Sequence, residues 1–290
     1  MSDLLPDSKI GIVPLNWRYE PARMEEFLAG IAAYGFTGIQ ISGEQGESAT
    51  FRDAMRANGI APAEQYLAIR CTQDGPVKGS EGESAITIGQ AITAKVDMIV
   101  FAVDGSDNRD RCAGRADAGP QLTAEGFSAL AAHVSKFAAI AAKAGIRSSF
   151  HPHAATYIET ERETKLLMEQ IDPDLVGLCL DVGHWIVGGA DPIKAVQDYS
   201  GRITHVHVKD VSGEVLARML SGEIETMNTA VEEYKLFVPA GTGLLDLRAL
   251  FMALDRVGFQ GWLMSEQDSA WEPSEAASGI SIANMKAALT

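Results

Sequence analysis

The 290-residue sequence predicts a single-domain (β/α)8 barrel. Short β-rich runs alternate with amphipathic segments from one end of the chain to the other, and this unit occurs eight times. Glycine follows several amphipathic segments where a helix would end, as in AAYGF, RANGI and AKAGI. No linker divides the chain into two domains. Strict alternation of this kind favours a closed parallel barrel over an open sheet, so we expect one domain over residues 1–290.

The first half of the chain contains four of the eight units. Its expected strands are KIGIVPLNW (9–17), TGIQISGE (37–44), APAEQYLAI (61–69) and DMIVFAVDG (97–105). The segments that follow them space apolar residues three and four apart, which indicates helices with one buried face. These expected helices are PARMEEFLAGIAAYG (21–35), ESATFRDAMRANG (47–59), SAITIGQAITAKV (84–96) and TAEGFSALAAHVSKFAAIAAKAG (123–145).

The second half repeats the pattern. Its expected strands are IRSSFHPH (146–153), LVGLCLDVGHW (175–185), RITHVHVKD (202–210) and GWLMSEQD (261–268). The expected helices are ETERETKLLMEQI (159–171), DPIKAVQDYSG (191–201), LLDLRALFMALDRVG (244–258) and SGISIANMKAALT (278–290). The longest irregular segments are 71–83, 104–121, 211–242 and 267–278. The last three follow strands and so lie on the face where barrels build active sites; 211–242 has helical stretches of its own and could form a lid or a subunit contact.

Composition narrows the classes of partner. A formal net charge of −15 opposes binding to nucleic acid or to an anionic membrane. The N-terminal residues lack a secretory-signal pattern, and no run approaches the roughly 20 apolar residues of a membrane span. Cys71, Cys112 and Cys179 are too widely spaced for a disulfide framework or a zinc ribbon. We therefore expect a cytoplasmic protein that binds small neutral molecules or metal cations.

Histidines and carboxylates gather at the ends of consecutive expected strands. Five of the six histidines lie between residues 151 and 207. The ends of strands 5 to 8 carry His151 and His153, Asp181 and His184, His205, His207 and Lys209, and Glu266. In a barrel these ends converge on one mouth, where imidazole and carboxylate groups can surround a divalent ion. Mixed nitrogen and oxygen ligands suit Mn²⁺, Co²⁺, Fe²⁺ or Zn²⁺.

Each of these residues also has a structural interpretation. A histidine at a strand end can be a hydrogen-bonded core residue, and His133 on an expected helix is interpreted in that way. Lys209 could form a salt bridge to Asp210 or Glu266. Glu159 more simply begins a helix, where a carboxylate favours the helix dipole. The Gly-x-Gly sequence within 239–243 is only a weak indication of a phosphate-binding loop, and it is more simply interpreted as the start of the next helix. We therefore expect an unphosphorylated substrate.

The segments HPHAATYIET, LCLDVGHW, HVHVKD and WLMSEQD resemble the xylose isomerase-like TIM-barrel family, which includes sugar isomerases, epimerases and keto-sugar dehydratases. The resemblance covers nearly the whole chain. It implies a divalent ion, Mn²⁺ or Co²⁺ first and Fe²⁺, Zn²⁺ or Mg²⁺ as alternatives. It also implies the metal ligands His151, Asp181, His207 and Glu266, with His151 left open as ligand or base. Many epimerases carry glutamate at the position of His151, and the histidine-rich strand 5 is similar to the myo-inosose dehydratase branch. The segment Arg18-Tyr19-Glu20-Pro21 departs from that branch and leaves the exact substrate open.

The resemblance predicts a metal-dependent hydro-lyase that dehydrates a keto-inositol or related keto-sugar through an enediolate. The residues expected to transfer protons are His153, His184 and Lys209. The residues expected to contact substrate are Trp17 and Glu44, at the ends of strands 1 and 2, and His205; Trp17 could equally be core. The nearest alternatives are isomerisation or epimerisation of an unphosphorylated ketose and β-elimination from a 3-keto-glycoside. An abasic-site endonuclease and a non-catalytic binding barrel are the alternatives from other classes. Relatives suggest a dimer or tetramer.

Overall fold

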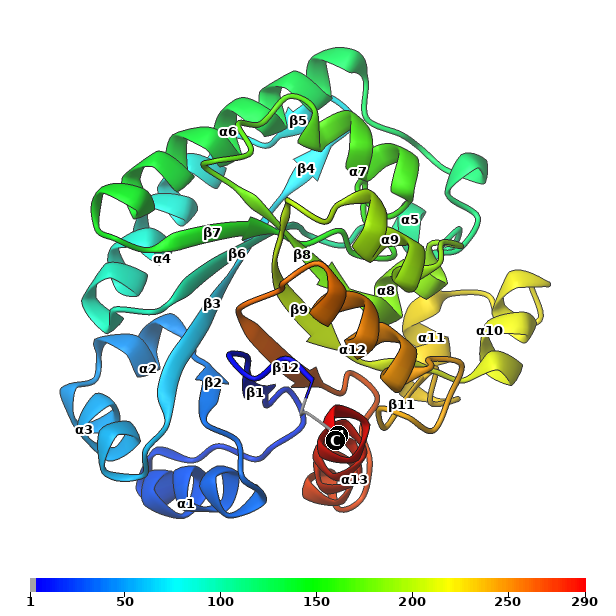
Figure 1. The fold of residues 1–290 in the computed structure, drawn as a ribbon. Helices are drawn as coiled ribbons and strands as arrows, with labels where there is room; N and C mark the ends of the chain where they lie inside the picture. The colour runs from blue at the N-terminus through cyan, green and yellow to red at the C-terminus, as the bar shows by residue number, and fades with distance from the viewer. Residues whose placement is uncertain (1–3) are drawn as a thin grey trace.

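Eight parallel strands close into a barrel in the computed structural model, which describes residues 4–290 (Figure 1). In chain order the barrel strands are β1 (Lys9–Val13), β2 (Gly38–Gln40), β3 (Ala61–Ile69), β6 (Met98–Val103), β7 (Arg147–Phe150), β8 (Gly177–Asp181), β9 (Ile203–Val208) and β12 (Trp262–Glu266). Each strand pairs with its chain neighbour among these eight, and β1 pairs with β12 to close the sheet. The predicted (β/α)8 barrel is therefore confirmed.

Eight helices form the outer layer. They are α1 (Met24–Tyr34), α3 (Ala49–Ala57), α4 (Ser80–Ala94), α6 (Ala124–Lys143), α7 (Glu161–Met168), α9 (Pro192–Asp198), α12 (Leu247–Arg256) and α13 (Ser274–Leu289). The sequence explains the limits of α6, for example. Thr123 accepts a hydrogen bond from the Gly126 amide at its start, and Phe127, Leu130 and Val134 repeat at helical spacing and are buried. The apolar face of each helix packs on the outside of the barrel, and most of the core lies in this layer.

The inside of the barrel changes character along its axis. An apolar cluster fills part of it: Trp262 and Ala63, near the starts of β12 and β3, are buried with Met264 and Val13. At Gly38 the indole of Trp262 takes the space that a β-carbon would need. The upper half, toward the C-terminal ends of the strands that we call the mouth, is instead filled by buried polar side chains. The fold thus concentrates its interior charges at the mouth.

Shorter elements follow the barrel strands at the mouth. The helical ones are η1 (Pro21–Arg23), α2 (Gly43–Glu47), α5 (Asp107–Asp110), η2 (Ala116–Ala118), α8 (Val182–Val187), α10 (Gly213–Leu220) and α11 (Met227–Glu232). Two small antiparallel pairs are β4 (Cys71–Thr72) with β5 (Gly75–Pro76) and β10 (Asp210–Val211) with β11 (Phe237–Val238). Within residues 4–290, no helix is long and apolar enough to cross a membrane.

The segment expected to form an insertion after strand 7 contains β10, α10, α11 and β11 (Figure 1). Its Val215, Met219 and Phe237 belong to an apolar cluster that they share with Ala154 and Val187 of neighbouring segments. The Asp210 carboxylate accepts hydrogen bonds from the backbone amides of residues 241, 243 and 245 at 2.8–3.0 Å. Asp210 therefore fixes the glycine-containing loop that leads into α12, which accounts for the Gly-x-Gly sequence without a phosphate.

Candidate active site

The central residue of the site is His207 on β9. Strand alternation points His205 and His207 to the inside of the barrel, and both are buried. His207 is in register with Asp181 on β8 and with Met264 on β12. The neighbouring strand ends thus surround the His207 ring with side chains that are distant in sequence.

The four residues expected to bind a metal lie together. The Nδ1 atom of His207 is 2.7 Å from Glu266 Oε2 and 3.7 Å from Asp181 Oδ2. The Nε2 atom of His151 is 3.2 Å from Asp181 Oδ2. One ligand atom from each of the four lies within 4.8 Å of the other three, and none of the residues is more than 8% exposed. We call His151, Asp181, His207 and Glu266 the upper cluster.

The donor set of the upper cluster fits a divalent cation. Two imidazole nitrogens and two carboxylate oxygens are ligands that Mn²⁺, Co²⁺, Fe²⁺ and Zn²⁺ accept. Glu266, at 8%, is the most exposed of the four, so the cluster opens toward the mouth. Two other groups that include His207 have suitable spacing, one with His151 and Cys179 and one with Glu64 and His205. Cys179, Glu64 and His205 are fully buried, and they lie deeper in the barrel.

Lys209 is the positively charged side chain beside the upper cluster. Its Nζ donates to Asp268 Oδ2 at 2.6 Å and lies 3.2 Å from Asp181 Oδ2 and 3.3 Å from Glu266 Oε2. Burial would lower the pKa of Lys209, but these three carboxylates outweigh it and raise the pKa above its ordinary value. The ammonium also donates to His184 Nε2 at 3.0 Å. Of the two salt bridges considered from the sequence, the one to Glu266 is present, whereas Asp210 is used by the 241–245 loop.

His153 and His184 lie side by side next to the upper cluster. Their ring centroids are 3.6 Å apart, and each ring centroid is 5.5 Å from that of His151. The Nδ1–H of His153 donates to the carbonyl of Ala154 at 2.6 Å. Burial, reinforced by His151 and Lys209, lowers the pKa of His153 to about 3. The structure therefore places all three residues expected to transfer protons around one small volume.

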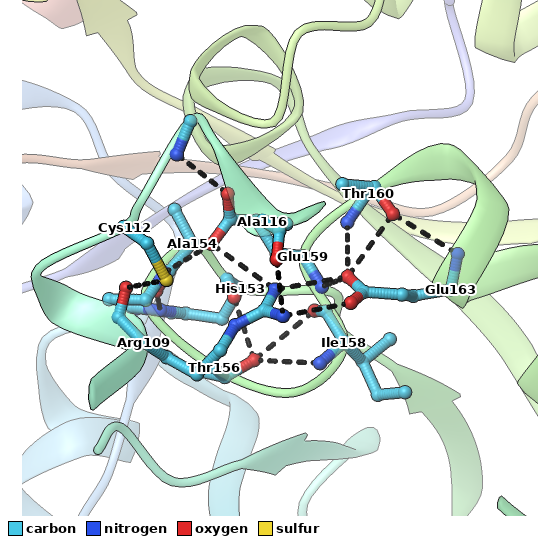
Figure 2. A network of polar contacts seen from close by, with 12 residues as sticks. Arg109, Cys112, Ala116, His153, Ala154, Thr156, Ile158, Glu159, Thr160 and Glu163 are labelled. Carbon is cyan, nitrogen blue, oxygen red and sulfur yellow. Dashed lines mark hydrogen bonds and ion pairs between the residues drawn. The ribbon is translucent and has the colours of Figure 1, made fainter. Parts of the chain in front are cut away.

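A buried ion-pair network holds the loop that carries His153. Figure 2 shows the Arg109 guanidinium against Glu163 and close to Glu159, with the Ala154–Thr160 backbone around them. Arg109 is 3.0 Å from Glu163 Oε1 and 3.6 Å from Glu159 Oε2. The Glu159 carboxylate accepts from the amides of Gly114 and Ala155 at 2.7 and 2.8 Å. Glu159 therefore joins two loops at the mouth, and the helix cap expected of it is supplied instead by Thr160 and Glu163.

Two residues expected to contact substrate lie elsewhere. Glu44 was expected at the end of strand 2, but β2 ends at Gln40 and Glu44 is exposed in α2 after the Ser42 cap. Trp17 packs edge-on against Phe27 and Tyr34, and its indole N–H donates to Ser278 at 2.9 Å. These contacts place Trp17 between α1 and α13, which corresponds to the core alternative.

His205 was also expected to face substrate, but it lies below His207. Its Nε2 hydrogen-bonds to the carboxylate of Glu64 on β3, and both residues are 0% exposed. Glu64 was not anticipated as a site residue. The available signal was a carboxylate in the middle of the apolar run APAEQYLAI, since a charge buried inside a strand needs a partner.

Asp268 and Tyr66 were likewise not assigned. Asp268 lies two residues beyond the end of β12 and forms the shortest contact with Lys209. The ring of Tyr66 is 5.9 Å from that of His151, edge to face. Tyr66 also lines a cavity of about 400 Å³ with Gln40, Gln65 and neighbouring residues. The site thus adjoins a polar space at the ends of β1 to β3.

Known proteins with similar sequences point to the same family. The family model described as xylose isomerase-like TIM barrel matches residues 28–288. The chain is 27% identical to an inosose dehydratase from Lactiplantibacillus plantarum over 285 residues, which are 93% of this chain and 91% of that protein. Among solved structures, 3-keto-D-glucoside 4-epimerase from E. coli superposes with a TM-score of 0.72 at 18% identity, covering 97% of this chain and 99% of that one. The IOLI protein with a binding zinc atom superposes with a TM-score of 0.67 at 16% identity, covering 96% of each chain.

Proposed function

Because the chain belongs to the xylose isomerase-like TIM barrel family, we propose that it is a divalent-metal-dependent hydro-lyase that dehydrates a keto-inositol or a related keto-sugar. The observation that carries the proposal is the upper cluster, with Lys209, His153 and His184 directly beside it. The relatives named inosose dehydratase, which match nine-tenths of the chain, support this substrate class.

His151, Asp181, His207 and Glu266 would hold the cation. A divalent cation there supplies positive charge that stabilises the negative charge developing on a substrate carbonyl oxygen. The nitrogen and oxygen ligands suit Mn²⁺, Co²⁺, Fe²⁺ and Zn²⁺, and we propose Mn²⁺ or Co²⁺ from the resemblance to the family. A protein of similar fold, the IOLI protein, has a bound zinc atom, which supports a metal in a barrel of this kind.

Dehydration needs a base and an acid on the same substrate. An imidazole, that of His153 or His184, takes the proton from the carbon next to the carbonyl. The Lys209 ammonium donates a proton to the β-hydroxyl as its C–O bond breaks, so that a carbon–carbon double bond forms and water leaves. His184 Nε2 and Lys209 Nζ are 3.0 Å apart, so a proton taken up by His184 can return to the lysine and restore both groups.

Epimerisation is the second candidate. The number of carboxylates around the reacting carbon distinguishes it from dehydration. An epimerase must hold a base on each face of the reacting carbon, and many members of the family supply one of them as a carboxylate where this chain has His151. The histidine leaves Glu266 opposite an imidazole instead of a second carboxylate. We therefore place dehydration first and an isomerase or epimerase of an unphosphorylated ketose second.

The experiment is a proton-exchange assay in D₂O. The Mn²⁺-loaded protein is incubated with 2-keto-myo-inositol and, separately, with a panel of ketoses, and products are analysed by mass spectrometry. Loss of water from the inosose is the expected result. Deuterium uptake with an unchanged formula would replace the lyase by an isomerase or epimerase, and no exchange with any substrate would contradict the proposed chemistry.

A further inference from the structure

Glu64 lies one layer below the upper cluster and contacts two histidines with one oxygen. Its Oε2 accepts from His207 Nε2 at 2.9 Å and from His205 Nε2. Glu64 and His205 are 0% exposed, and His207 is 1% exposed. We propose that Glu64 is a positioning residue that keeps the proton of His207 on Nε2, so that Nδ1 is the nitrogen presented to the cation. This inference rests on the metal site of the proposed function.

The two nitrogens of the His207 ring face opposite sides of that layer. Nε2 points down to Glu64, whereas Nδ1 points up to Glu266 at 2.7 Å and to Asp181 at 3.7 Å. A neutral imidazole carries one N–H and one lone pair. Carboxylate oxygens, which can only accept, face both nitrogens, so without a cation each nitrogen can hold a hydrogen. A cation in the upper cluster would displace the hydrogen on Nδ1, whereas the Glu64 carboxylate holds the hydrogen on Nε2. The lone pair is then left on Nδ1, inside the upper cluster.

Holding the ring in this way affects cation binding in two respects. A ligating histidine that donates its other N–H to a carboxylate is fixed in tautomer and orientation and becomes a stronger ligand. The hydrogen bond also crosses the barrel from β9 to β3, so it prevents the ring from turning about its χ2 axis. Because Glu64 sits beneath the ring, it does this without taking a coordination position from the substrate.

The lower group of Glu64, His205 and His207 could instead bind a cation of its own, since its ligand atoms are also within 4.8 Å of one another. That cation would use Nε2 of His207 and would leave the upper cluster without this ligand. The lower group offers three protein atoms in a fully buried layer, with no open side for a substrate. We therefore assign the cation to Nδ1 and the proton to Nε2.

The test compares wild type, Glu64→Gln and Glu64→Asp with a matched control, Asp97→Asn. The Asp97 carboxylate accepts a hydrogen bond from the indole N–H of Trp262 at 2.9 Å, near the opposite end of the barrel. Asp97→Asn therefore removes a carboxylate that also accepts from a ring N–H, but at a distance from the site. Mn²⁺ affinity and stoichiometry are measured by titration calorimetry. The tautomer of His207 is measured by ¹⁵N NMR of the histidine rings in the Zn²⁺-loaded protein, with Glu64→Asp as the second variant if Glu64→Gln does not fold.

We expect the wild type to bind one Mn²⁺ per chain. Glu64→Gln should bind it about 10- to 100-fold more weakly, which is the usual effect of removing the hydrogen-bond partner of a metal-ligating histidine. Asp97→Asn should bind Mn²⁺ with unchanged affinity. NMR should show His207 protonated on Nε2 in the wild type. Unchanged affinity in both Glu64 variants, or a His207 bound through Nε2, would overturn this inference and leave the proposed function standing. A wild type that binds no Mn²⁺ would overturn the proposed function as well.

Discussion

Replacing Lys209 by methionine is the most informative change to the site. The Lys209 ammonium is buried and lies within 3.3 Å of carboxylate oxygens of Asp181, Glu266 and Asp268. Methionine has a similar length and carries no charge, so the three carboxylates lose their shared cation. Loss of one partner from a buried ion pair costs about 3–5 kcal/mol of folding free energy, because the remaining charge is left uncompensated.

The same change should have the opposite effect on cation binding. Lysine and a divalent cation both neutralise these carboxylates, so a bound cation replaces much of the charge that the substitution removes. Suppose that the substitution costs about 4 kcal/mol of folding free energy without metal and about 1 kcal/mol with metal bound. The difference must then appear in the binding free energy of the cation, so Lys209→Met should bind Mn²⁺ roughly 100-fold more tightly than wild type. Turnover should nevertheless fall by about 10²–10⁴-fold, because the proton donor is gone.

The assay is urea unfolding of wild type and Lys209→Met, each in EDTA and in saturating Mn²⁺, together with calorimetric Mn²⁺ titration. Lys143→Met, on the exposed end of α6, is the control and should change stability by less than about 0.5 kcal/mol. An equal loss of stability in both conditions, or weaker Mn²⁺ binding by Lys209→Met, would show that lysine and cation do not share these carboxylates.

Three further changes test other parts of the structure. Arg109→Met leaves the buried carboxylates of Glu163 and Glu159 without their guanidinium and should cost about 3–5 kcal/mol in urea unfolding; a loss below about 1 kcal/mol would contradict the network. Burial raises the pKa of Glu159 from 4.5 to about 7, so the folded protein holds this proton more tightly than the unfolded chain and should lose stability as pH rises through this interval. Glu159→Gln should flatten the plot of unfolding free energy against pH, and an equally steep plot would contradict that role. Asp210→Ala removes hydrogen bonds to three amides of the 241–245 loop and should destabilise by roughly 3 kcal/mol or more, with faster amide exchange confined to that loop; unchanged exchange there would show that other contacts hold it.

The barrel could be predicted from the sequence because its evidence is local and repeated. Each unit carries its own strand and helix signals, and eight weak signals in strict alternation leave few alternatives. The residues of the upper cluster could be named because all four lie at strand ends, which a barrel brings together, and because the resemblance to the family distinguishes them from the other residues there. The fold thus converts a pattern along the chain into proximity in space.

The remaining site residues depend on details that the pattern does not contain. Glu64 belongs to the site because β3 turns it inward, next to a register shift between β2 and β3. Glu44 does not, because β2 ends at Gln40 and the chain turns into a short helix before Glu44 is reached. The depth of His205 follows from its register with Cys179, one layer below the pairing of Asp181 with His207. Depth along the barrel axis is a property of the closed sheet and leaves no signal in a single strand.

In the function that we propose, His151, Asp181, His207 and Glu266 hold one divalent cation. The most direct measurement is the anomalous scattering of Mn²⁺ in a crystal of the protein grown with that ion. We expect one strong peak within coordination distance of all four residues, with Nδ1 as the His207 ligand. A peak in the layer of Glu64 and His205, or no peak at the mouth of the barrel, would contradict it.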